Sequence, residues 1–199
     1  MPAQRAKIPD PDYKTGIDYW DNQPASLDGV LGGFGSGTLP RVDAVGSRQF
    51  AQYLLPSLCK VPSAARPLNP PPVTHRTRVL DVGAGIGRVT QTTLLPLFDD
   101  VVLVEPVEKF VKTAYQNCLD AINTPPENLP SLKRWKGMAE KKTSVTFLQA
   151  GLQQFDPSRP EENTKLIGRL GYEGPTESTF DVVWCQWCLG HLSDAELVA

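Results

Sequence analysis

The chain has 199 residues, with 20 lysines and arginines against 22 aspartates and glutamates, so its formal net charge is −2. This length suits one domain with a buried core, and the near-neutral charge argues against a nucleic-acid partner, which would require a basic surface. No apolar run approaches the roughly 18 residues of a membrane span, so we expect no membrane partner. Residues 1–10 lack the apolar stretch of a secretory signal, and four cysteines are too few for a disulfide scaffold. We therefore expect a reducing, cytoplasmic location.

The first 72 residues predict a small helical extension followed by a linker. The glycine-rich stretch 31–37 predicts a flexible or tightly turned loop. Ser47 can cap a short helix, because apolar residues recur at helical spacing after it. Six prolines fall within residues 56–72, and such a run cannot be the interior of a helix or a central strand. We therefore expect an N-terminal helical extension with a proline-rich linker over residues 1–72 and a separate core over residues 73–199.

In the core, short apolar segments alternate with helical ones. Strands are predicted at residues 78–82, 101–104, 145–148 and 181–184, and helices at residues 87–95 and 108–122. Strands that are apolar on both faces and alternate with helices indicate a parallel sheet covered on both sides, so the expected fold class is α/β. The stretches 123–130 and 156–178 are polar and contain prolines, and we interpret them as surface insertions.

The last residues predict a helix that has only begun. Residues Ser193 to Glu196 form a capping box, and the sequence stops three residues later. The apolar stretch 180–187 would then form a strand with an open edge, which natural proteins rarely leave bare. We expect the fold to be incomplete at the C-terminus, as a fragment of a longer domain, or a partner to cover this edge.

The segment 79–88, Val-Leu-Asp-Val-Gly-Ala-Gly-Ile-Gly-Arg, carries the strongest local signal. A strand here enters a turn in which Gly83, Gly85 and Gly87 leave room for a ligand against the backbone, beside a helix N-terminus. Glu105 ends the next strand, where a carboxylate can accept hydrogen bonds from ribose hydroxyls.

The spacing of these glycines favours one ligand over another. A dinucleotide site would show G-x-G-x-x-G, since its pyrophosphate needs a helix N-terminus, but this turn reads G-x-G-x-G after Asp81. S-adenosylmethionine has no phosphate and carries a positive sulfonium, so it tolerates an acid there. We favour a methyltransferase over an NAD enzyme.

The fourth predicted strand ends next to three polar or aromatic candidates, Gln186, Trp187 and His191. In an open parallel sheet, ligands bind at the carboxyl ends of the strands, so these side chains are expected near the site. A lone histidine is more often structural than catalytic, but its place beyond a strand end favours a base. The pair Cys185 and Cys188 has the spacing of a metal or redox pair. No second C-x-x-C accompanies it, so we predict no metal site and interpret both as small apolar residues.

With these residues in place, the chain resembles the eukaryotic alpha-N-terminal protein methyltransferases, which modify proteins that begin Xaa-Pro-Lys once the initiator methionine is removed. The matching blocks are Tyr19-Trp20, residues 28–35, residues 47–50, residues 81–88, residues 94–98, residues 151–155, Gln186-Trp187 and residues 190–192. The blocks Leu-Gly-Gly-Phe-Gly and Gln-Trp with Gly-His-Leu are specific to this family.

The resemblance implies a role for each matching position. The positions that match cofactor contacts are Gly83, Arg88, Glu105, Leu152, Gln153 and Gln186. Arg88 would meet the methionyl carboxylate, and Glu105 would meet the ribose, where the family usually has aspartate. The positions that match walls of the peptide channel are Trp20, Leu31 and Trp187. His191 matches a proposed general base.

The resemblance also implies the fold and the function. The expected fold is a class I S-adenosylmethionine-dependent methyltransferase, Rossmann-like, and the expected cofactor is S-adenosylmethionine. The expected reaction is mono-, di- or trimethylation of the α-amino group of Xaa-Pro-Lys tails, ribosomal proteins included, in the cytoplasm and the nucleus. The family's chain continues past the equivalent of Ala199 with further strands and substrate-holding residues. The alternatives are therefore a truncated form that binds cofactor without catalysis or folds poorly, a small-molecule methyltransferase and, more distantly, an NAD enzyme.

Overall fold

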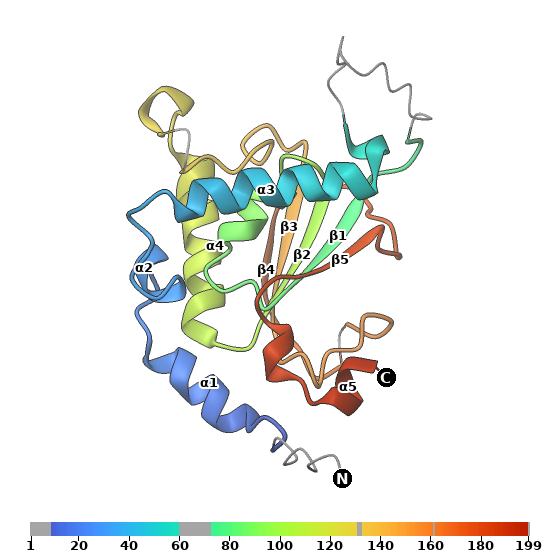
Figure 1. The fold of residues 1–199 in the computed structure, drawn as a ribbon. Coiled ribbons are helices and arrows are strands. Elements are labelled where there is room, and N and C mark those ends of the chain that lie inside the picture. Colours follow the sequence, from blue (N-terminus) through green and yellow to red (C-terminus); the bar gives the residue numbers. More distant parts are fainter. Residues whose placement is uncertain (1–8, 60–72, 131–132, 161, 199) are drawn as a thin grey trace.

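The computed structural model describes residues 9–59, 73–130, 133–160 and 162–198, and its centre is a five-stranded sheet (Figure 1). The strands are β1 (Arg78–Val82), β2 (Asp100–Glu105), β3 (Ser144–Gln149), β4 (Lys165–Gly171) and β5 (Val182–Cys185). Their order is β4-β3-β2-β1-β5, in which β3, β2, β1 and β5 are parallel and β4 is antiparallel to β3. The α/β fold and the four predicted strands are confirmed.

The strand β4 corrects two predictions. The stretch 156–178 was expected to be a surface insertion and the sheet to be parallel throughout, but Lys165–Gly171 pairs antiparallel with β3. The half-buried Ile167 and Leu170 pack against the core. This outer strand carries charged residues, as edge strands commonly do, and its weak apolar pattern is compensated by backbone hydrogen bonds to β3.

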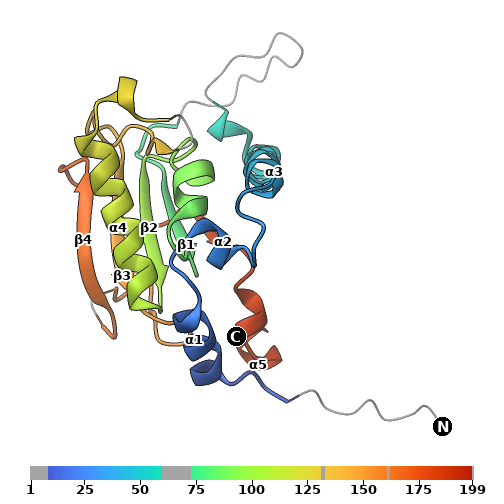
Figure 2. The same cartoon turned by 90° about the vertical axis from the view of Figure 1, so that its left-hand side faces the viewer.

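Helices lie at the carboxyl ends of the strands and over one face of the sheet (Figures 1 and 2). They are α1 (Tyr13–Asn22), α2 (Leu27–Val30), α3 (Leu39–Leu54), α4 (Glu108–Asn123) and α5 (Asp194–Val198), with a π-helical turn at Thr90–Leu94 and 3₁₀ turns at Pro56–Leu58, Pro126–Asn128 and Leu189–His191. The helix predicted to begin at Ser47 begins instead at Leu39, with Thr38 as its N-cap. Pro40 lies in its first turn, where the missing N–H costs nothing, so that proline starts α3 rather than interrupting it.

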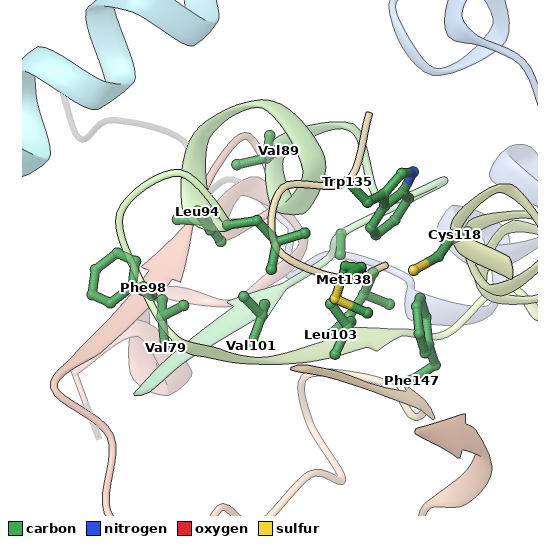
Figure 3. Close-up of a cluster of buried hydrophobic side chains, with 14 of the residues drawn as sticks. Val79, Val89, Leu94, Phe98, Val101, Leu103, Cys118, Trp135, Met138 and Phe147 are labelled. Atoms are coloured by element: carbon green, nitrogen blue, oxygen red, sulfur yellow. The ribbon is translucent and has the colours of Figure 1, made fainter. Parts of the chain in front are cut away.

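The core lies on both faces of the sheet. On one face, α4 and the turn after β1 bury the larger cluster, in which Phe98, Phe147 and Leu103 are almost completely enclosed (Figure 3). On the other face, Leu80, Val102 and neighbours pack against Leu152, Phe155 and Phe180 from the loops around β4. Both faces of β1 and β2 are therefore buried, as expected for central parallel strands.

The C-terminal end of the described chain has the predicted local structure. The Ser193 hydroxyl donates to Glu196 at 2.7 Å and accepts from the Glu196 backbone N–H at 3.3 Å, so the predicted capping box is confirmed. The strand β5 pairs only with β1 in the described part of the chain, and its Val183 is exposed. Most of the predicted proline-rich linker, residues 60–72, lies outside the described residues. No described helix has the length and apolar character of a membrane span.

Candidate functional site

Residues at the carboxyl ends of β1, β2 and β5 and residues of α1 line a cavity. Figure 1 shows α1 at this end of the sheet. Every predicted site residue except Leu31 lines it; they are Trp20, Gly83, Arg88, Glu105, Leu152, Gln153, Gln186, Trp187 and His191. Leu31 is buried away from this cavity, and its neighbour Val30 lines it instead. The tertiary structure thus joins residues from the N-terminal extension with residues from the core.

The turn after β1 requires glycine. Gly83, Gly85 and Gly87 have φ angles of 65°, 58° and 77°, in the left-handed region that side chains disfavour. The Gly83 and Ala84 N–H groups donate to the Val104 carbonyl at 2.9 and 3.2 Å, which fastens the turn to β2. A Cβ on Gly83 would lie 2.6 Å from the Cys188 Cβ, so no larger residue fits without displacing that wall.

Glu105 at the end of β2 is anchored by backbone groups. Its carboxylate accepts from the Gly85 N–H at 2.8 Å and from the Val107 N–H at 2.9 Å. Burial raises its pKa to about 7, although both backbone hydrogen bonds oppose that change. Each carboxylate oxygen keeps a further lone pair, so Glu105 can still accept a hydrogen bond from a hydroxyl of a ligand in the cavity.

A second buried acid, Asp81, lies beneath the turn. The Thr90 hydroxyl donates to its carboxylate at 2.5 Å. Burial raises the pKa of Asp81 to about 7. Both acids therefore hold a proton in the folded state at pH values where the unfolded chain, with pKa values of 3.8 and 4.5, has released it.

We expect the free energy of unfolding of the ligand-free protein to fall as pH rises from about 5 to about 7, because the native state binds more protons there. His75, whose pKa Asp181 raises above 6.5, acts in the same direction at the upper end. Urea unfolding at several pH values tests this, and Asp81→Asn should flatten the slope. A slope unchanged in Asp81→Asn would contradict the assignment to this buried acid.

Arg88 and Gln186 share a partner that the sequence analysis missed, Asp43 of α3. Arg88 Nη1 lies 2.5 Å from Asp43 Oδ2, and Gln186 Nε2 donates to both Asp43 oxygens at 2.8 and 3.0 Å. The Arg88 and Asp43 side chains are only 9% and 14% exposed. Trp184 Nε1 completes the cluster by donating to Gln186 Oε1 at 2.9 Å. Asp43 is a half-buried acid on the inner side of α3, and this was the available signal. The sequence of α3 alone does not identify the residues that Asp43 contacts.

We expect Asp43→Ala to weaken binding of S-adenosylhomocysteine about tenfold and to leave 5′-methylthioadenosine unaffected. Asp43 fixes the directions of Arg88 and Gln186, which are the residues predicted to meet the methionyl group, and methylthioadenosine lacks that group. Calorimetry with both ligands measures the difference, and Asp43→Asn should lose less. An equal loss for both ligands, or tighter binding, would show that Asp43 does not position these side chains.

His191 lies between the cavity and α1. Trp20 Nε1 donates to His191 Nε2 at 3.2 Å, so Nε2 carries a lone pair in this arrangement and the ring proton belongs on Nδ1. Gln153 Nε2 donates to the His191 carbonyl at 3.2 Å and ties the 3₁₀ turn to the loop after β3. Trp20 of the N-terminal extension thus orients the imidazole. This hydrogen bond joins a predicted channel residue, Trp20, to the predicted base, His191.

Trp187 presents an aromatic wall at the mouth of the cavity. It is 63% exposed, and its φ of 63° is in the left-handed region. The Arg88 guanidinium lies 5.7 Å from the centre of its ring. A bulky residue in such a conformation is strained, and strained residues of this kind concentrate at functional sites.

The lining fits a nucleoside joined to an amino acid. Leu152, Val107 and Phe110 offer an apolar wall for a base, and Glu105 offers an acceptor for ribose hydroxyls. The glycine turn offers the cradle that a Cβ would fill, and Arg88 offers a cation for a carboxylate. S-adenosylmethionine has a base, ribose hydroxyls and a carboxylate, and its close approach to the backbone of the turn needs the cradle that the glycines leave open.

The chain is similar to known proteins over most of its length. The model of the family described as "AdoMet dependent proline di-methyltransferase" matches residues 9–199. The chain is 32% identical over 191 residues to "Alpha N-terminal protein methyltransferase 1" of Schizosaccharomyces pombe, covering 96% of this chain and 63% of that protein. It is 31% identical over 187 residues to "N-terminal Xaa-Pro-Lys N-methyltransferase 1-B" of Xenopus laevis, covering 94% of this chain and 61% of that protein.

A solved structure has a similar fold. It is a SAM-dependent methyltransferase of Leishmania major, with a TM-score of 0.57 and 25% sequence identity. The match covers 94% of this chain and 52% of that chain. The chain therefore spans between about half and two thirds of the length of these relatives.

Proposed function

The chain belongs to the family of AdoMet-dependent proline di-methyltransferases, and from this premise we propose that it methylates the α-amino group of proteins whose N-terminus reads Xaa-Pro-Lys, with S-adenosylmethionine as the methyl donor. The observation that carries the proposal is that the predicted donor contacts, the predicted base and two of the three predicted channel walls, Trp20 and Trp187, line one cavity. Mono-, di- and trimethylated termini are the products, and ribosomal proteins with Pro-Lys starts, in the cytoplasm and nucleus, are candidate substrates.

The donor would be held by four groups of the chain. Bound S-adenosylmethionine supplies an electrophilic methyl group on its positive sulfur. Arg88 would form a charge-assisted hydrogen bond with the methionyl carboxylate, and Gln186 would lie beside it. Glu105 would accept hydrogen bonds from the ribose hydroxyls, and Leu152 and Gln153 would contact the adenine. The glycine turn excludes side chains from this contact surface.

The acceptor amine needs only a weak base. An α-amino group has a pKa of about 7.7–8.0, so roughly a tenth is neutral at pH 7, whereas lysine, near 10.4, is almost entirely charged. His191 accepts the remaining proton through its Nε2 lone pair once Trp20 yields that position to the peptide. This difference in amine pKa favours chain starts over lysine side chains.

Positioning supplies most of the rate. Holding an amine in line with a reactive carbon can contribute about 7–11 kcal/mol. Trp20 and Trp187 form the walls that would hold the peptide, and their ring faces tolerate an increasingly cationic product. Repeated methylation of one terminus follows from that tolerance.

The test is a methyl-transfer assay with the purified chain. We expect a peptide that begins Ser-Pro-Lys to gain methyl groups on its α-amine, located by fragment-ion mass spectrometry. The matched control is the same peptide acetylated at its N-terminus, which should remain unchanged. No product despite cofactor binding would favour the binding-only alternative, and methylation of the acetylated peptide would point to lysine as the acceptor.

A further inference from the structure

Two cysteines flank the segment that carries Gln186 and Trp187. Cys185 ends β5, and Cys188 caps the 3₁₀ turn Leu189–His191. Both are free thiols; Cys185 is half-buried and Cys188 is buried against the cavity. The C-x-x-C spacing is that of dithiol pairs in redox proteins. The proposed function uses neither sulfur.

The fold brings both side chains to the same point of the glycine turn. Cys185 lies beside Val82 in the parallel register of β1 and β5, about 4.8 Å away by the usual strand spacing. Cys188 packs on the next residue, Gly83, where its Cβ lies 2.6 Å from the position of an added Cβ. The two thiols are near enough for each to shift the pKa of the other.

This contact divides the two thiols into different chemical roles. The neighbouring Cys188 thiol lowers the pKa of Cys185, while the same pairing, together with burial, raises the pKa of Cys188. The pairing therefore favours the thiolate at Cys185, which is partly accessible, and the protonated thiol at Cys188. A reactive thiolate next to a protonated thiol is the arrangement found in oxidation-sensitive sites.

We propose that Cys185 and Cys188 are a site of reversible oxidative modification, at which a peroxide converts them to a disulfide that weakens cofactor binding. The Cys185 thiolate attacks one peroxide oxygen, the O–O bond breaks, and a sulfenic acid and hydroxide form. The Cys188 sulfur then displaces the sulfenic oxygen, the S–S bond forms, and water leaves. The two thiols lose two electrons and two protons, and one hydrogen peroxide becomes two waters.

The disulfide would act directly on the site. Gln186 and Trp187 lie between the two sulfurs, and the Cys188 carbonyl accepts the His191 N–H at 3.1 Å. Disulfide geometry is narrow, so bond formation would constrain the backbone of this segment. Gln186 would then lose its alignment with Asp43, and Trp187 would leave its left-handed conformation. The effect on binding rests on the proposed function, whereas formation of the disulfide does not.

The test treats the full chain with graded hydrogen peroxide. We expect peptide mapping to identify a Cys185–Cys188 disulfide, and calorimetry to give about tenfold weaker binding of S-adenosylhomocysteine. Dithiothreitol should restore both the thiols and the affinity. Cys185→Ser should abolish the disulfide and the peroxide effect, Cys185→Ala serves if that variant folds poorly, and Cys59→Ser should respond like the unmodified chain.

Three results would overturn the proposal. They are oxidation to sulfinic acid without a disulfide, a disulfide that leaves affinity unchanged, and a peroxide effect that persists in both Cys185 variants. A reduced chain that does not bind S-adenosylhomocysteine would instead contradict the proposed function, and the disulfide mapping would still test the cysteine pair.

Discussion

Gly83→Val is expected to weaken the affinity for S-adenosylhomocysteine at least about 100-fold, or ~2.7 kcal/mol. Two independent effects act at this position. The added Cβ would lie 2.6 Å from the Cys188 Cβ, and the φ of 65° is one that a β-branched residue strongly disfavours. The backbone of the turn would therefore have to shift, and a shift in either direction would alter the surface that contacts the ligand.

The measurement is calorimetric titration, with thermal unfolding recorded alongside it. Gly46→Val is the matched control, because Gly46 lies in α3 with ordinary helical φ and no atom within 4 Å of an added Cβ. We expect that variant to bind normally. Intact binding by a folded Gly83→Val protein would refute the assignment of the glycine turn to the cofactor.

His191→Ala is expected to lower kcat for peptide methylation by a factor of about 10²–10⁴, which is the usual contribution of a general base, while the affinity for S-adenosylhomocysteine stays unchanged. His191 lines the cavity, and its Nε2 accepts a hydrogen bond from Trp20, so its lone pair faces the channel residue rather than a donor contact. Loss of the imidazole removes proton acceptance without removing a cofactor contact.

The chain offers a matched control for this substitution. Its other histidine, His75, lies before β1, at the opposite end of the sheet, where it contacts Asp181 at 2.8 Å. His75→Ala should leave kcat unchanged. Equal losses of affinity and rate in His191→Ala would mean that the imidazole supports the cavity wall, and an unaffected rate would exclude it as the base.

The N-terminal extension contributes more to the site than its sequence indicated. The Asp43 carboxylate holds Arg88 and Gln186, and the Trp20 indole holds His191, so α1 and α3 both orient residues of the core. The predicted boundary between residues 1–72 and residues 73–199 therefore runs through the candidate site in space. We expect deletion of the extension to disturb cofactor contacts as well as peptide contacts.

Several features followed from the sequence alone because they depend on neighbours along the chain. The glycine turn is one, since the three glycines within residues 83–87 themselves indicate where side chains must be absent. The strands of the parallel sheet are another, because a run that is apolar on both faces can be satisfied only in a covered sheet. The capping box at Ser193 is local as well, with its hydrogen bonds spanning three residues.

Only the tertiary structure decided the remaining features, because their partners are far away in the sequence. β4 is a strand because β3 offers it backbone hydrogen bonds, and α3 extends back to Leu39 because the core accepts its inner side. Asp43 meets Gln186 across 143 positions, and no pattern within either segment encodes that contact. The cysteine pair was interpreted as apolar filling because spacing cannot reveal a thiol contact, which depends on how β5 and the turn after β1 meet.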